Sequence, residues 1–209
     1  MKTQRQILIA GLLALSLATG LLGGCGGDKK PEAKPAQPAG PQTIKLAHVV
    51  NEKDGFHVAA LKFKELVEQR TQGKVKVELF PNAQLGDERT LIEGMQIGTV
   101  HMGVITNGPV ANFLPEIAAF EMPFLFNSPA QAYKVLDGEV GQKVLAKLDA
   151  INLKGLAYAE RGFRNLTNSK RPVKTPADMA GLKIRVMENP VYIDTFKTLG
   201  TNPVPMALT

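Results

Sequence analysis

The feature that most constrains the fold is a strand that runs directly into a helix within residues 178–206. In Lys183–Val186, apolar residues alternate with basic ones, which is the period-two pattern of a strand with one buried face. Pro190 is a favoured first helical residue, and Gly200 stands where a helix is commonly capped. The segment between them predicts a helix of about two or three turns. Its apolar positions, at helical spacing, are Ile193, Phe196 and Leu199.

Arg185 falls near the carboxyl end of that strand, just before the helix begins. In open α/β sheets, ligands bind at the carboxyl edge of the strands, so this position is a candidate site. A guanidinium group offers a planar fork of donors that matches the geometry of a carboxylate. We therefore expect Arg185 to bind a carboxylate.

The rest of the folded region alternates strands with helices. Period-two alternation and short apolar runs predict strands at residues 43–49, 75–79, 102–105 and 153–159. Helical spacing predicts helices at residues 56–70, from Asp87 onward, at 129–136 and at 139–150. A loop follows residue 105, and Glu116 and Glu121 are expected to face water on it. Strands that alternate with helices indicate parallel βα units, so the expected fold class is α/β.

The N-terminal part has the features of an export signal. Lys2 and Arg5 precede an apolar run in residues 1–24, which we interpret as a signal peptide. Cys25 is the only cysteine, and its spacing after Leu-Gly-Gly resembles a bacterial lipobox, in which the cysteine is lipidated and becomes the N-terminus. A spare thiol after an ordinary cleavage site is the alternative. Residues 25–42 are rich in proline and lack large apolar side chains, so they are predicted to be a solvated tether.

Composition and charge exclude some classes of protein. The chain carries 25 basic and 19 acidic residues, a net charge of +6, but Lys2 and Arg5 belong to the signal segment. No cluster of basic residues is interleaved with aromatic residues, so nucleic acid is not an expected partner. The 209 residues permit one or two domains, and a hydrophobic content of 44% is enough for a packed core.

Residues that could carry out catalysis or bind a metal form no recognisable motif. His48, His57 and His101 lie in separate predicted elements and lack the HExxH spacing of a zinc helix. We interpret the first two as solvated or hydrogen-bonded loop residues. The sequence has no glycine-rich phosphate loop after a strand and no GxSxG nucleophile elbow. We therefore expect no metal, no cofactor and no enzymatic activity.

Several short segments occur in a characteristic order and spacing. They are residues 73–80, Gln84-Leu85-Gly86, Leu114-Pro115-Glu116, Pro123-Phe124-Leu125-Phe126, GLKIRV at 181–186, and residues 203–206. Together they resemble the solute-binding subunits of tripartite ATP-independent periplasmic (TRAP) transporters, the DctP family, over residues 43–209. The resemblance implies an α/β, two-lobed periplasmic-binding-protein fold of type II, the Venus-flytrap fold. Residues 43–159 would form the first lobe, and residues 160–209 would form part of the second.

The resemblance also implies roles for individual residues. In this family, the arginine of the strand that matches GLKIRV holds the carboxylate of an organic acid, which gives that role to Arg185. Arg164 matches a position at the lobe junction that often contacts the ligand, although a surface arginine at a strand end is an equally good interpretation. Thr106 and Asn107 would end a strand of the first lobe and could donate to the ligand.

The implied function is capture of an organic acid outside the cytoplasm and its delivery to two TRAP membrane permease subunits. Uptake would be driven by an ion gradient, and a lipid on Cys25 would anchor the protein to a bacterial membrane. One alternative is a lipoprotein that senses a ligand and signals without transport. Another is an esterase or lyase with its site in the cleft, which the missing nucleophile disfavours.

The chain departs from the family pattern near its C-terminal end. It stops at Thr209, before a complete member of the family would end, and Leu208 stands where the family often has an aromatic residue over the ligand. We therefore expect an incomplete second lobe. We also expect this 209-residue chain to bind its ligand poorly, or to be a non-functional fragment of such a binding protein.

Overall fold

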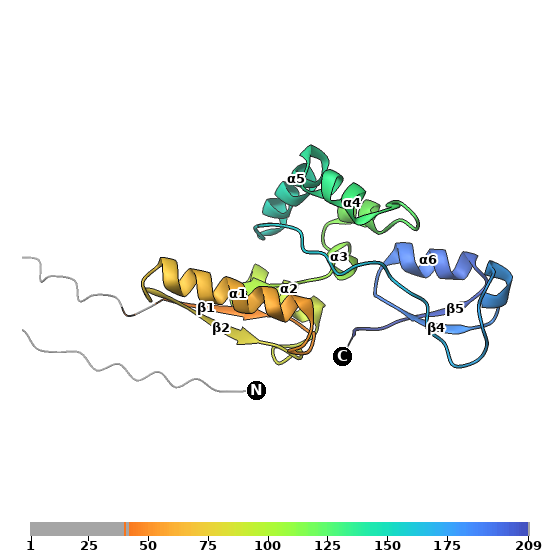
Figure 1. The fold of residues 1–209 in the computed structure, drawn as a ribbon, viewed down its shortest axis with the longest axis horizontal. Helices are drawn as coiled ribbons and strands as arrows, with labels where there is room; N and C mark the ends of the chain where they lie inside the picture. Colours follow the sequence, from red (N-terminus) through yellow and green to blue (C-terminus); the bar gives the residue numbers. More distant parts are fainter. Residues whose placement is uncertain (1–39, 41, 209) are drawn as a thin grey trace, which may run out of the picture. The chain divides into compact units, whose positions relative to one another are not determined.

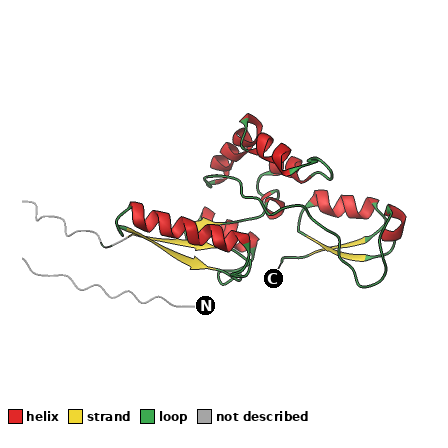
Figure 2. Cartoon of the chain, in the orientation of Figure 1, coloured by secondary structure: helices red, strands yellow, loops and turns green. Residues whose placement is uncertain are grey.

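The structure is a computed structural model, which describes residue 40 and residues 42–208. The predicted signal peptide, Cys25 and most of the predicted tether lie outside the described residues. Figure 1 labels the elements along the chain, and Figure 2 distinguishes helices, strands and loops by colour. Within the described part, no helix is both long enough and apolar enough to cross a membrane.

The first sheet contains three parallel strands in the order β2-β1-β3. They are β1 (Gln42–Ala47), β2 (Val75–Phe80) and β3 (Met102–Gly103). The register places Leu46 opposite both Leu79 and Met102. The predicted parallel βα arrangement is therefore confirmed for this sheet.

The strand predicted at residues 102–105 is longer than the strand observed. β1 ends at Ala47, which is paired with Gly103, so residues beyond 103 have no further ladder partner on β1. One more hydrogen bond follows, from Val104 N to Ala47 O at 3.1 Å. The apolar run predicted a fully buried strand, but the two residues of β3 are only half-buried.

Two capped helices accompany the first sheet. Helix α1 (Gly55–Arg70) begins at Asp54, whose carboxylate accepts from Phe56 N at 3.0 Å, and α2 (Glu88–Gln96) begins at Asp87, whose carboxylate accepts from Thr90 N at 2.8 Å. Both helices were predicted. The cap matters because the first N–H groups of a helix have no partner within it.

The core under α1 consists of a few residues from three elements. Leu46, Ala60 and Val77 form one buried cluster between α1 and the sheet. Ala59, which precedes Ala60 on α1, is exposed. A small side chain at the margin of an apolar face can lie in solvent at little cost, because it has little apolar area to bury.

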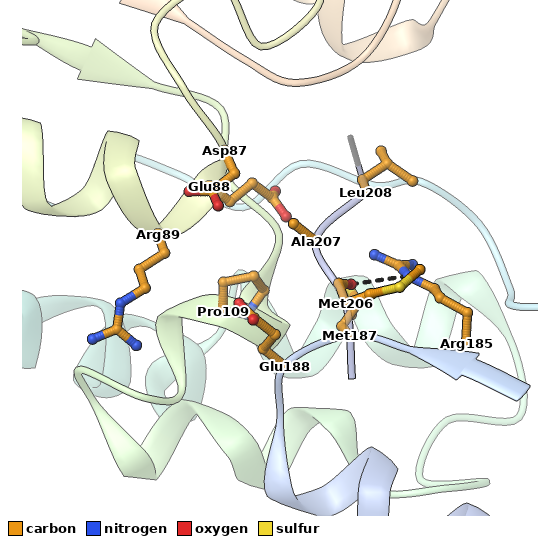
Figure 3. A pocket seen from close by; sticks show the side chains of 10 residues that line it. All are labelled: Asp87, Glu88, Arg89, Pro109, Arg185, Met187, Glu188, Met206, Ala207 and Leu208. Carbon is orange, nitrogen blue, oxygen red and sulfur yellow. Dashed lines mark hydrogen bonds between the residues drawn. The ribbon is translucent and has the colours of Figure 1, made fainter. Parts of the chain in front are cut away.

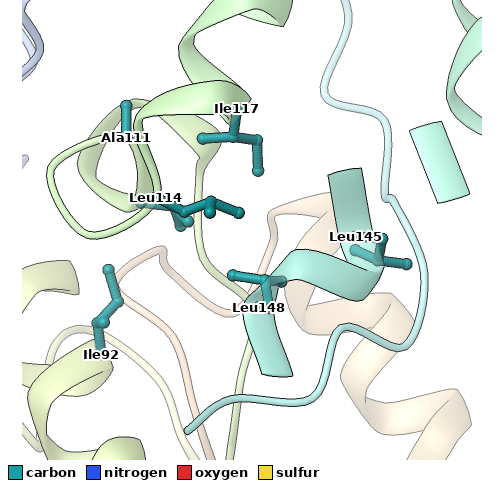
Figure 4. Close-up of a cluster of buried hydrophobic side chains, with 7 residues drawn as sticks. Ile92, Ala111, Leu114, Ile117, Leu145 and Leu148 are labelled. Carbon is teal, nitrogen blue, oxygen red and sulfur yellow. The ribbon is translucent and has the colours of Figure 1, made fainter. Parts of the chain in front are cut away.

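Residues 107–151 form a mainly helical segment. It contains α3 (Asn107–Val110), the 3₁₀ helix η1 (Pro115–Glu121), α4 (Pro129–Leu136), α5 (Glu139–Ala146) and the 3₁₀ helix η2 (Lys147–Ile151). The prediction of a loop after residue 105 was therefore wrong for α3 and η1, and the helix predicted at 139–150 changes to 3₁₀ geometry after Ala146. All of these elements except α4, which has no buried residue, share a buried cluster with α2. The cluster includes Ile92, Ala111, Leu114, Ile117, Leu145 and Leu148 (Figure 4).

Residues 153–159 do not form the predicted strand. Side chains, not a backbone ladder, hold this segment in place. Gly155 lies against Leu145 of α5, and the Tyr158 hydroxyl donates to Gly141 O at 2.9 Å. Of its apolar residues, Leu153 and Tyr158 pack against the cluster that contains Leu145, whereas Leu156 is exposed.

The second sheet contains the strand and helix from which the sequence analysis began. The short 3₁₀ helix η3 (Pro176–Met179) precedes this sheet in the chain. The sheet pairs β4 (Lys183–Val186) in parallel with β5 (Asn202–Pro205), and α6 (Pro190–Thr198) connects the two strands. Gly200 has φ +75°, the left-handed conformation expected after a helix end. The predicted strand and helix are confirmed. The core of this unit consists of Leu182, Ile184 and Val186, with Tyr192, Ile193 and Phe196 packed against them.

β5 has an unusual composition for a strand, because Pro203 and Pro205 are two of its four residues. Asn202 N donates to Leu182 O at 2.8 Å, and Met206 N donates to Val186 O at 3.0 Å. The even-numbered residues therefore direct their N–H groups toward β4, and the two prolines occupy the alternate positions.

Candidate functional site

Arg185 lies on β4, where the sequence predicted it. Its Nε donates to Met206 O at 2.9 Å, a bond that fixes the guanidinium against the chain after β5 (Figure 3). Burial is the main cause that lowers its pKa, and the nearby positive charge of Arg164 adds to this. Arg185 nevertheless remains exposed to solvent.

A small cavity adjoins Arg185. Its lining comes from the start of α2, from α3, from β4 and the following loop, and from the chain after β5 (Figure 3). Glu88, Met187, Glu188 and Leu208 are among the lining residues. The cavity measures about 10 Å³, which is roughly room for one water molecule. An organic acid needs more space, so these walls would have to separate to admit one.

Arg164 is held by the second sheet's helix. Its Nε donates to the Tyr192 hydroxyl at 2.9 Å, and its guanidinium carbon lies 5.2 Å from the centre of the same ring. A further contact joins its Nη2 to Met187 Sδ at 3.7 Å. Arg164 is thus an exposed side chain whose orientation is fixed by its contacts with Tyr192 and Met187.

Two carboxylates lie near this pair of guanidinium groups. Glu88, only 8% exposed, accepts from Thr106 N at 2.6 Å and from Thr106 Oγ1 at 2.8 Å. Glu121 of η1 accepts from the Tyr192 hydroxyl. Burial raises the pKa of each carboxyl, and the positive charge of Arg164 partly offsets that rise in both. The site therefore contains acceptors as well as cations.

The structure corrects one prediction about these acids and adds residues that the sequence analysis missed. Glu121 was expected to face water, but it lies half-buried against Tyr192, because this segment forms the 3₁₀ helix η1 instead of extending as a loop. Glu88 and Tyr192 were not predicted at all. Glu88 directly follows the capping residue of α2, near the carboxyl edge of a parallel sheet, and that position was an available signal.

Thr106 and Asn107 lie near the same cluster, at the beginning of α3. Thr106 directs its hydroxyl to Glu88 and lies 3.5 Å from Met187 Sδ, measured from Oγ1. The Asn107 side chain lowers the pKa of Glu121, against the larger effect of burial. The four predicted ligand-binding residues, Arg185, Arg164, Thr106 and Asn107, are therefore close to one group of charges, and their roles toward a ligand stay predictions.

Two of the histidines contact each other. His48 and His57 are buried rather than solvated, and His48 Nε2 is 3.0 Å from His57 Nδ1. Burial lowers the pKa of His48, and the neighbouring His57 adds to this. Across residues 42–208, no three His, Cys, Asp or Glu side chains are grouped so that they could hold a metal ion.

The comparisons with known proteins define the class. Residues 46–209 match the family model DctP, described as bacterial extracellular solute-binding protein, family 7. The chain belongs to this family. It is 42% identical to the 2,3-diketo-L-gulonate-binding periplasmic protein YiaO of Escherichia coli K12, and 36% identical to the C4-dicarboxylate-binding protein DctB of Bacillus subtilis 168. These matches cover 79% and 77% of this chain but only 50% and 46% of the two relatives, so the chain spans about half their length.

Solved structures of TRAP periplasmic solute-binding proteins share the fold. The sugar acid binding protein DctPAm of Advenella mimigardefordensis DPN7T, in complex with galactonate, has a TM-score of 0.79 and 38% identity. The Polaromonas sp. JS666 protein bound to D-erythronate has a TM-score of 0.77 and 43% identity. The matches cover 80% and 79% of this chain and 54% and 55% of those chains. The expected two-lobed periplasmic-binding fold is thereby confirmed.

Proposed function

We propose that this chain is the organic-acid-binding part of a TRAP transporter's solute-binding protein. The observation that supports this most directly is the pair of guanidinium groups, Arg185 and Arg164, near the carboxyl end of β4 in a chain of this family. The protein would capture a carboxylate outside the cytoplasm and deliver it to the membrane permease subunits. An ion gradient would then drive uptake.

Each predicted residue has a role in this proposal. Arg185 holds the ligand carboxylate with its planar fork, and Arg164 adds a second positive charge. Thr106 and Asn107 contribute polar contacts from the first-sheet side. One charge-assisted hydrogen bond contributes about 1.5–3 kcal/mol, whereas micromolar affinity needs about −8 kcal/mol. Several contacts and exclusion of water must therefore act together, which requires the walls of the cavity to close over the ligand.

The charges of the site favour a hydroxylated monocarboxylate. Glu88 and Glu121 can accept hydrogen bonds from ligand hydroxyl groups, and in their ionised form they would repel a second carboxylate. Relatives of similar identity are described with both kinds of ligand: galactonate and D-erythronate on one side, and succinate in the Sulfurospirillum deleyianum protein on the other. We propose that this chain belongs with the first group.

Isothermal titration calorimetry on the full-length natural protein tests the proposal. Galactonate, D-erythronate and succinate serve as ligands, and neutral galactose serves as the control for hydroxyl binding without a carboxylate. We expect binding of at least one hydroxylated acid, weaker binding of succinate, and none of galactose. Binding of galactose alone, or of none of the acids, would contradict the proposed function.

The N-terminal predictions complete the proposal. Residues 1–24 would direct export, Cys25 would carry a lipid, and residues 25–42 would let the binding part reach away from the membrane surface. The binding part itself would consist of a first lobe at 43–159 and a second beginning at residue 160.

A further inference from the structure

The loop of residues 187–189 joins β4 to α6 and docks on α3. Asn189, which is fully buried, is the centre of this contact. Its Nδ2 donates to Gly108 O at 3.1 Å, and its Oδ1 accepts from Val191 N at 2.8 Å, which caps α6. One amide group therefore connects the first turn of α6 to a helix that follows the first sheet.

Two further contacts support the docked loop. Asn112 Nδ2 donates to Glu188 O at 2.6 Å. Met187 lies so close to Gly108 that a Cβ added there would be 2.5 Å from Met187 Cε. The methionine thus fills the space that a side chain at position 108 would occupy, and a larger residue there would displace its flexible end. We call this contact the clasp: Gly108 and Asn112 on one side, residues 187–189 on the other.

Both guanidinium groups depend on the loop of the clasp. Arg185 is two residues before Met187 on the same strand end, so its backbone moves with the loop. Arg164 lies against Met187 Sδ and bonds to Tyr192, which belongs to the helix that Asn189 caps. A shift of residues 187–189 would therefore change the position of each arginine, and the shift would differ between them.

We propose that Asn189 is a positioning residue: by docking the 187–189 loop on α3, it sets the spacing of Arg185 and Arg164 so that one ligand carboxylate can engage both. This inference rests on the proposed function, because it concerns the same site. According to this proposal, the clasp contributes to ligand affinity as well as to the stability of the fold.

Asn189→Asp is the sharpest variant. Aspartate keeps the shape and the acceptor that caps α6, but it loses the donor to Gly108 O and places a carboxylate against that carbonyl. Asn152→Asp is the matched control, since Asn152 Nδ2 donates to Gln96 O at 3.0 Å at a place remote from the arginines. Gly108→Ala is the second variant. It displaces the flexible end of Met187 and leaves all hydrogen-bonding groups in place, so it retains a folded protein if Asn189→Asp does not.

Affinity is measured by calorimetry with galactonate, D-erythronate and succinate, in the full-length natural protein, and melting temperature is measured in parallel. We expect Asn189→Asp to weaken binding of the preferred acid by about tenfold or more, Gly108→Ala by about threefold or more, and Asn152→Asp by less than about twofold. A tight charge-assisted contact loses most of its strength when its geometry is disturbed, which is why the loss should be large.

A second background separates positioning from simple destabilisation. With Arg164→Gln already present, spacing between two guanidinium groups no longer matters, so Asn189→Asp should add less than about a threefold loss. Its effect on melting temperature should be the same in both backgrounds. Equal affinity of Asn189→Asp and wild type, or the same loss of affinity in both backgrounds, would overturn the inference. If the wild-type protein binds no acid, the proposed function fails first, and the inference fails with it.

Discussion

Arg185 is the residue on which ligand binding depends most in this proposal. Arg185→Lys keeps the positive charge but loses the planar fork and the Nε bond to Met206 O. We expect a loss of affinity for the preferred acid of about tenfold or more, measured by calorimetry. Arg70→Lys, an exposed position at the end of α1, is the control and should bind as wild type does. Equal affinity of Arg185→Lys and wild type would show that Arg185 does not hold the carboxylate.

Glu121 gives the protein a pH-dependent stability. Burial raises its pKa above the ordinary value of 4.5, so the folded state binds its proton more tightly than the unfolded state does. The stability that this proton contributes is fully present below pH 4.5 and is lost as the pH rises through the raised pKa. Ionisation of Glu121 therefore costs more free energy in the folded protein than in the unfolded chain.

Glu121→Gln removes the free-energy cost of ionising this carboxyl in the folded protein, and it keeps an acceptor for the Tyr192 hydroxyl. We expect its melting temperature at pH 7.5 to exceed that of wild type by about 2 °C, roughly what 1 kcal/mol gives in a domain of this size. The difference should shrink toward pH 4. Glu116→Gln is the control from the same 3₁₀ helix. The bond from Lys147 lowers the pKa of Glu116, so loss of this carboxylate should not raise the melting temperature at pH 7.5. Thermal unfolding that showed no gain for Glu121→Gln at pH 7.5 would contradict this explanation.

Among the elements, the segment of residues 153–159 shows where sequence patterns fail. Gly155 is the residue that lets it pack on α5, since a Cβ there would lie 2.4 Å from Leu145 Cγ and 2.9 Å from Leu145 O. Gly155→Ala should lower the free energy of unfolding by roughly 1–3 kcal/mol, the usual cost of overpacking. Urea denaturation measures this. Gly55→Ala, which has nothing within 4 Å of its added Cβ, should be neutral or slightly stabilising. A neutral Gly155→Ala would mean that this packing is loose.

The sequence predicts elements whose signals are local. β4 and α6 are predicted because the alternation at Lys183–Val186, Pro190 and Gly200 all act within a few residues. The strand predicted at residues 153–159 is wrong, because an alternating pattern does not specify whether the apolar residues pack on a sheet or on a helix. The same holds for the site. The position of Arg185 follows from its own strand, whereas the contacts of Asn189 join residues 81 positions apart, which a single sequence does not show.

At the scale of the whole molecule, the N-terminal predictions decide where the protein is located. Cys25→Ser should abolish labelling with radioactive palmitate and should move the protein from the membrane fraction to the soluble fraction. Stable anchoring needs more than one acyl chain, and Cys25 is the proposed site that carries the lipid, so its replacement should remove the anchor. Ligand affinity should not change, because the substitution lies in the proposed tether. Continued labelling of Cys25→Ser would show that another residue is acylated.

Pro203 and Pro205 have a consequence for contact between molecules. The N–H groups of β5 that face β4 belong to residues 202, 204 and 206, so the prolines occupy the positions whose N–H groups would point to the opposite edge. At those two positions, that edge can accept hydrogen bonds but cannot donate them. Strands of another molecule add to a sheet by exchanging both kinds of bond, and proline at an edge blocks this exchange. Within the described residues, the second sheet is therefore protected against edge-to-edge self-association on this side.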